Sequence, residues 1–197
     1  MTTPDTVDTI ARVAPDGLVA AVRARRPVTR AQLQASHDAL FAPVDDAEFP
    51  VAERALVAAF ATRLTADDAT AAHYADLAAG ADAQRAAVVA ALGAGSATTG
   101  PFGTYREEGL VEESTEGRRL AIDSAARDAL GERLAAALEH THLLVYRPRE
   151  AAGDALDRLL ESGWSIDGIV TLSQLVSFLA FQQRVVAGLR VLEEASA

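Results

Sequence analysis

The chain contains no cysteine among its 197 residues. It therefore has no disulfide framework, no cysteine-ligated zinc and no thiol to carry redox chemistry. A chain of this length buries roughly 70% of its unfolded surface on folding, so it needs no covalent or metal cross-link. We predict one folded unit in a reducing compartment, with no cofactor and no bound metal.

Basic residues are outnumbered, with 18 against 28 acidic residues and a formal net charge of −10. A polyanion would be repelled unless the basic side chains were strongly clustered. The nearest approach to a cluster is Arg23, Arg25, Arg26 and Arg30. Nucleic acid is therefore excluded as an expected partner.

Long hydrophobic runs are also absent. The N-terminus has neither a basic start nor an apolar core, so it does not resemble a signal peptide. The longest apolar stretch, residues 169–181, is interrupted by polar side chains and is shorter than the roughly 20 residues that cross a bilayer. We expect a cytoplasmic protein with no membrane partner.

Alanine is abundant and aromatic residues make up only 5% of the chain, which favours helices over strands. Helical periodicity and capping signals divide the chain into N-terminal helices (1–93), an irregular insertion (94–122) and C-terminal helices (123–197) of a single all-α domain. The insertion holds a possible hairpin around residues 105–120. Loops of this length are often functional or mobile.

Individual boundaries follow from local signals. Thr29 is expected to cap a third helix, and Thr65 a fifth, with Asp68 completing a capping box. Gly80 and Gly93 are expected to stop the fifth and sixth helices. One helix is predicted to run without a break across residues 124–144.

The final predicted helix begins at a Ser165 cap and is unusually apolar. Its apolar residues cover more than one stripe, which indicates burial on several sides. We expect a homo-oligomer that assembles through helices including residues 165–192.

Two segments together resemble one known family. Residues 53–65, followed by His73 and Tyr74, are similar to the core motif of the alkylhydroperoxidase D-like and carboxymuconolactone decarboxylase superfamily. Residues 163–170, followed by Phe178, Phe181, Arg184, Val185 and Gly188, are similar to the C-terminal helix pair of its peroxidase-related members. The resemblance implies the alkylhydroperoxidase D-like helical fold and assembly into dimers, trimers or hexamers.

The peroxidase members of that superfamily use a Glu, a Cys-x-x-Cys and a His. The resemblance places these four roles on Ala55, Asp67, Thr70 and Tyr74, so none is retained. Peroxide reduction by this route needs a thiolate that passes through a sulfenic acid to a disulfide. We expect the family-associated peroxidase activity to be lost.

The decarboxylase members lack the cysteine pair, and their outline is partly retained by Leu64, Thr65, Asp68, Ala72 and His73. Their Glu and second His are replaced. His73 is the candidate catalytic residue, because a neutral imidazole can act as a general base near pH 7. The predicted pocket is formed by His73 with Asp67, Thr70, Tyr74 and Arg184.

Other polar residues have simpler interpretations. Asp67 and Asp68 also suit the first turn of a helix as caps. Arg184 could hold a ligand carboxylate or form an ion pair with Glu53 or another acidic residue. His140 and His142 lie two apart on a helix, which is poor geometry for one metal ion.

Two functions remain open on the sequence. The first is non-redox acid–base chemistry on a small acidic or lactone-like compound. The second is a non-catalytic oligomeric partner, structural or regulatory, of a cysteine-containing relative. A helical ligand-binding module is a third hypothesis.

Overall fold

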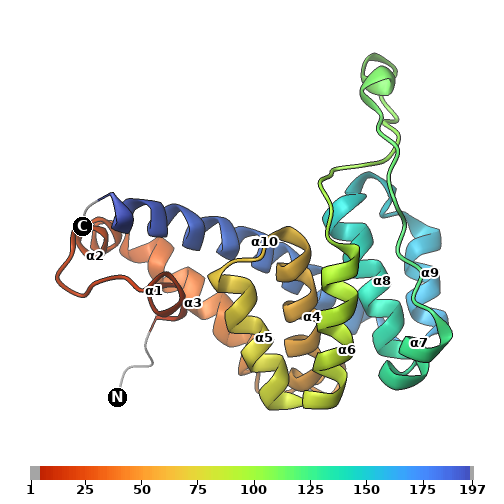
Figure 1. Cartoon of the computed structure of the whole chain (residues 1–197), viewed down its shortest axis with the longest axis horizontal. Helices are drawn as coiled ribbons and strands as arrows, with labels where there is room; N and C mark the ends of the chain where they lie inside the picture. The colour runs from red at the N-terminus through yellow and green to blue at the C-terminus, as the bar shows by residue number, and fades with distance from the viewer. Residues whose placement is uncertain (1–4, 196–197) are drawn as a thin grey trace.

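The computed structural model describes residues 5–195, and its secondary structure is helical, as predicted. The α-helices, labelled in Figure 1, are α1 (Thr6–Ala11), α2 (Leu18–Ala24), α3 (Pro27–Phe41), α4 (Val51–Thr65), α5 (Ala69–Ala81), α6 (Ala83–Ser96), α7 (Ser124–Leu130), α8 (Glu132–Tyr146), α9 (Gly153–Glu161) and α10 (Ile166–Glu194). Two 3₁₀ turns, Glu108–Glu113 and Pro148–Glu150, complete the set.

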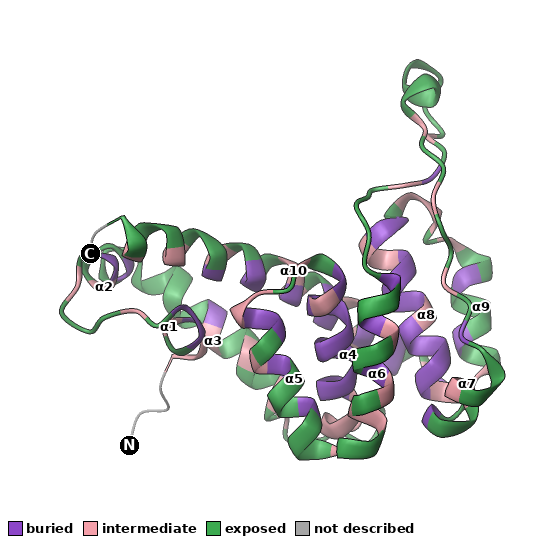
Figure 2. Cartoon of the chain, viewed as in Figure 1, coloured by how far each residue is buried: buried purple, intermediate pink, exposed green. Residues whose placement is uncertain are grey.

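Helix α4 forms the centre of the core, and Figure 2 shows it almost wholly buried. Its sequence is rich in small and apolar residues, so α5, α6, α8 and α10 all pack against it. The buried charge is Arg54, whose guanidinium donates to the backbone oxygens of Phe49 and Leu40, the latter at 2.8 Å. These bonds satisfy a group that would otherwise be costly to bury.

Helix α10 joins the two ends of the molecule. Its first half packs against α4, α8 and α9, and its second half lies against α1, α2 and α3 (Figure 1). Ser165 caps it as expected, because its Oγ accepts from the Gly168 amide at 3.1 Å. By length and mean hydropathy, 1.3 over 18 residues, α10 is the one helix in residues 5–195 that could cross a membrane; core helices of soluble proteins have the same composition.

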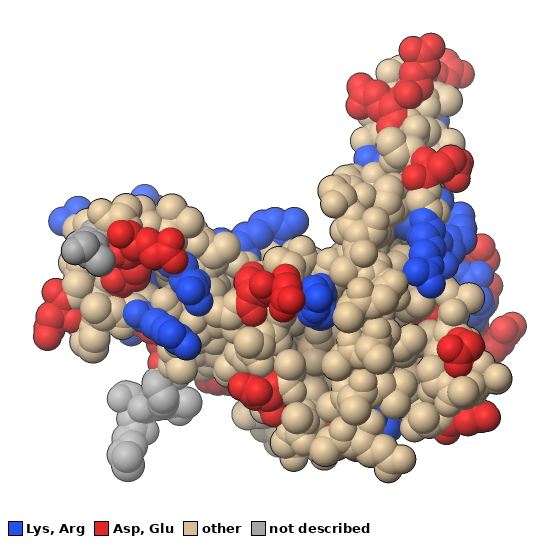
Figure 3. All heavy atoms as spheres, viewed as in Figure 1, with Lys and Arg blue, Asp and Glu red and all other residues tan. Residues whose placement is uncertain are grey.

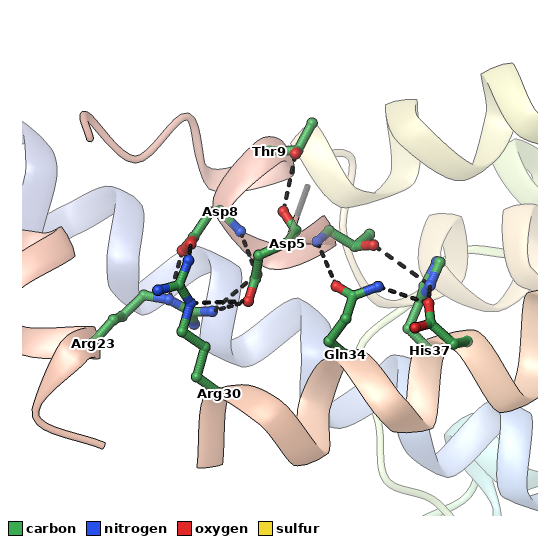
Figure 4. Close-up of polar contacts among 9 residues, drawn as sticks. Asp5, Asp8, Thr9, Arg23, Arg30, Gln34 and His37 are labelled. Carbon is green, nitrogen blue, oxygen red and sulfur yellow. Dashed lines mark hydrogen bonds and ion pairs between the residues drawn. The ribbon is translucent and has the colours of Figure 1, made fainter. Parts of the chain in front are cut away.

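The N-terminal helix is attached by a cluster of ion pairs (Figure 4). Asp5 caps α1 and also accepts two bonds from the Arg23 guanidinium, each at 2.9 Å. Arg30, on α3, reaches both Asp5 and Asp8. Because Arg23 is almost fully buried, the two carboxylates provide the charge that it requires.

Residues 97–123 form a projection that we call the arm, which rises from the body in Figure 1. Its two sides meet at one antiparallel bridge, Gly103 with Thr115, so the predicted hairpin is reduced to a single pair. Its base is fixed by Tyr146, whose backbone oxygen accepts from the Phe102 amide at 2.6 Å. The base also contacts Arg147, which donates to the Gly117 oxygen.

Several predicted boundaries were wrong. Helix α3 begins at Pro27, because proline suits the first turn, and Thr29 lies inside the helix. Asp68, rather than Thr65, caps α5, and its carboxylate accepts from the Thr70 and Ala71 amides. The Thr65 hydroxyl instead donates to Ala61 within α4.

Glycine was misjudged as a helix stop in two places. Helix α5 continues through Gly80 to Ala81, and α6 continues through Gly93 to Ser96. A Cβ on Gly93 would lie 3.2 Å from the Arg63 Cγ, so this glycine permits close packing on α4. Conversely, the continuous helix predicted over 124–144 is divided at Gly131, which has φ +83°.

Candidate functional site

The predicted site around His73 is filled by aromatic rings. His73 is half-buried on α5 and packs edge-on against Tyr74, with ring centroids 5.0 Å apart. Tyr74 also packs against Phe41, which stacks on His37. Burial, and to a lesser extent the nearby His37, lower the pKa of His73, so its imidazole is neutral at pH 7.

Thr70 and Tyr74 lie on the buried side of the same helix. The Tyr74 hydroxyl donates to the Gln182 Oε1 at 2.6 Å, and the Gln183 amide donates to the Thr62 backbone oxygen at 3.2 Å. The pKa of Tyr74 is raised, chiefly by burial, so the phenol remains protonated. These bonds connect α5, α10 and α4, and they place residues 53–74 in adjacent helices beside α10 as the sequence reasoning required.

The other two members of the predicted pocket point away from it. Asp67 is exposed and pairs with Arg63 at 3.3 Å, so the ion pair, and not a cap, accounts for it. Arg184 is exposed on α10, and its guanidinium donates to the Ala180 oxygen of its own helix at 2.7 Å. The alternative ion pair with Glu53 was wrong, because Glu53 is bound by Arg133.

A larger cavity lies elsewhere, among α7, α8, α9 and the C-terminal side of the arm. Its volume is about 890 Å³, within the range of small-molecule sites. Neither His73 nor any other member of the predicted pocket lines it. Its lining is Arg119, Leu120, Ala121, Arg127, Glu132, Ala136, Glu139, His140, His142, Leu143, Arg147, Glu150, Asp154, Ala155, Arg158, Leu159, Glu161 and Ser162.

Two buried histidines line this cavity. His140 is 5% exposed and His142 only 1% exposed. Burial lowers the pKa of each to about 4; nearby arginines act in the same direction, Arg158 on His140 and both Arg118 and Arg147 on His142. Both rings are therefore neutral at pH 7, and the His142 Nε2 has no hydrogen-bond partner in the described chain.

The charged groups of the lining differ in how far they are already paired. Arg147 makes two bonds to the Glu150 carboxylate, and Arg119 binds the same group, which lowers the pKa of Glu150. By contrast, Arg158 has no ion pair with any residue from 5 to 195. Among the arginines of the lining, Arg158 is therefore the one available to bind a ligand.

The lining has four arginines and five carboxylates, and Figure 3 shows basic side chains gathered where the arm meets the body. Arginines are the charged groups that help to lower the pKa of the two histidines, Arg158 for His140 and both Arg118 and Arg147 for His142. An unpaired imidazole nitrogen close to arginines suits the acidic group of a ligand. Within the described chain, no group of three or more His, Asp or Glu side chains is placed to hold a metal ion.

The sequence reasoning noticed these two histidines but assigned them no binding role. Two positions on one helix point in different directions, and this argument applies to chelation of a single ion. One cavity can extend around the side of a helix, so that both imidazole rings line it. The adjacent Arg147 and the insertion before α7 were the signals that could have suggested a pocket here.

No protein-family model, curated protein or solved structure matches this chain.

Proposed function

We propose that this chain binds a small organic anion in the cavity between α7, α8, α9 and the arm, as a cysteine-free relative of the alkylhydroperoxidase D-like superfamily without its redox activity. The observation that supports binding is His142, which lines the cavity and whose buried Nε2 has no hydrogen-bond partner in the described chain. A buried polar atom without a partner is costly, and a ligand hydrogen bond would remove that cost.

Binding is favoured over acid–base catalysis by the protonation state of the histidines. An efficient general base has a pKa near the working pH, whereas His140 and His142 have pKa values of about 4. Such rings form hydrogen bonds but take up protons weakly at pH 7. All 18 basic residues are arginine, so a lysine Schiff base is not available to this chain either.

The lining indicates the chemistry of the ligand. Arg158 and the His142 Nε2 would contact a carboxylate or a phosphate. Leu120, Leu143 and Leu159 provide apolar surface for the rest of the molecule. The expected ligand is therefore a compound with one acidic group on an apolar body.

The test is a matched pair of probes, benzoate and benzamide, with inorganic phosphate as a third. We expect benzoate to raise the melting temperature in proportion to the logarithm of its concentration, and benzamide to have no such effect. Arg158→Gln and His142→Leu should each weaken benzoate binding at least tenfold. The control Arg106→Gln, in the exposed part of the arm, should leave it unchanged.

Two results would contradict this proposal. The first is the absence of any shift with benzoate or phosphate at millimolar concentration. The second is binding that persists unchanged in both cavity variants, which would place the site elsewhere.

A second candidate is the non-catalytic oligomeric partner. The packing of His73 on Tyr74, and of Tyr74 on Phe41, supports it, because aromatic rings cover one side of His73. Copurification with a cysteine-containing relative from the native host would favour this role. Turnover of a lactone that is lost in His73→Gln would count against it.

A further inference from the structure

The exposed side of α10 contains a row of residues at alternating spacings of three and four. Every member of this row is exposed, although Figure 2 shows the opposite side of the helix packed into the body. The row is Asp167, Val170, Gln174, Ser177, Phe181, Arg184, Gly188 and Val191. This spacing is the seam of an antiparallel or parallel helix pair.

The composition of the row is unusual for a solvated surface. Val170, Phe181 and Val191 are 50%, 51% and 65% exposed, and Ile166 beside them is 72% exposed. Only two of the eight positions are charged. Single apolar residues are common on protein surfaces, but four on the same side of one helix favour a contact surface.

The two charged members point to one particular occupant. Asp167 and Arg184 have opposite charges and bound a six-residue segment of the row whose midpoint lies between residues 175 and 176. Neither forms an ion pair with any residue that the structure describes. If a second copy of α10 lies antiparallel about that midpoint, Asp167 of each copy faces Arg184 of the other.

The four positions between Asp167 and Arg184 match in the same register, and Gly188 and Val191 lie beyond the paired segment. Val170 faces Phe181 of the second copy, which pairs two apolar side chains on each side of the centre. Gln174 faces Ser177, which pairs two hydrogen-bonding groups at the centre. Two-fold symmetry repeats each contact, so one surface is complementary to itself.

We propose that two copies of this chain associate through their α10 helices, antiparallel, with reciprocal Asp167–Arg184 ion pairs and Val170–Phe181 contacts. This interface is separate from the cavity, so it does not depend on the proposed ligand. It assigns a partner to Arg184, which sequence reasoning had placed in a pocket.

Charge reversal provides the test. Asp167→Arg places arginine opposite arginine in a homodimer, and Arg184→Asp places aspartate opposite aspartate, so each variant alone should dimerise at least tenfold more weakly. Mixing the two variants creates two favourable pairs in a heterodimer. The double variant Asp167→Arg/Arg184→Asp should also dimerise like the natural chain. The controls Asp128→Arg and Arg106→Asp reverse exposed charges away from α10.

Light scattering over a range of concentrations, with circular dichroism to verify folding, gives the readout. The expected result is a species of twice the 20.6 kDa chain mass for the natural protein and for the mixture, with monomers for each single variant. A natural chain that stays monomeric at all concentrations would overturn the proposal. A dimer unaffected by either reversal, or a monomer that binds phosphatidylcholine vesicles through α10, would overturn it equally.

Discussion

The two cavity histidines should make the protein sensitive to mild acid. Both have pKa values of about 4 in the folded chain, below the ordinary histidine value of about 6.5. The unfolded chain therefore binds more protons as the pH falls through 6.5. The contribution of each ring to the free energy of unfolding is fully present above pH 6.5. It is lost progressively as the pH falls to about 4.

The magnitude follows from these two values. Between pH 7.5 and 5.0, each ring removes about 2 kcal/mol from the free energy of unfolding, so the pair removes about 4 kcal/mol. Marginal proteins have only about 5–15 kcal/mol in total, so the loss is large enough to measure.

The assay is urea unfolding at pH 7.5 and pH 5.0 for the natural chain, His142→Gln and His140→Gln/His142→Gln. We expect the double variant to retain most of the stability that the natural chain loses over this interval, and the single variant about half of it. Glu150 and Asp82, whose pKa values are lowered, lose their contribution at more acidic pH and do not affect this comparison. Arg106→Gln, in the exposed part of the arm, serves as the control outside the cavity.

One result would refute the reasoning. If the double variant loses as much stability between pH 7.5 and 5.0 as the natural chain, the two imidazoles are not held neutral by burial. The cavity would then be open enough to solvate both charged rings.

Three further outcomes are expected. Tyr74→Phe removes the donor to Gln182 and should lower the free energy of unfolding by about 1–2 kcal/mol, measured in urea; no change would mean that water replaces the hydroxyl. Asp5→Ala removes one of the two carboxylates that pair with the buried Arg23 and should cost about 3 kcal/mol at pH 7, which thermal unfolding would detect. Thiol-dependent reduction of cumene hydroperoxide should not exceed that of heat-inactivated protein, and clear turnover would contradict the argument from the missing cysteines.

Helical content could be predicted because it depends on local composition and periodicity. The abundance of alanine and the Ser165 cap act within a few residues, and both were interpreted correctly. Glycine was less reliable, since its effect depends on distant contacts. Gly93 continues a helix because it faces Arg63 across a close contact, whereas Gly131 ends one with a positive φ.

The cavity could not be derived from the sequence. Periodicity assigns His140 to a face of α8, but it does not show that α9 and the arm stand beside that face. The same limitation applies to Arg184, because a polar residue in an apolar helix can point inward or outward. Only the packing of α10 on α3 and α4 determines which side remains exposed.

The exposed backbone of the arm, together with the path of α10, makes this chain suitable for division into two pieces. The arm carries exposed arginines at 106, 118 and 119, where trypsin can cut. Helix α10 comes from the second piece but is packed against α1, α3 and α4 of the first. A chain cut in the arm should therefore stay assembled under native conditions, and the two fragments produced separately should reconstitute one folded protein when mixed.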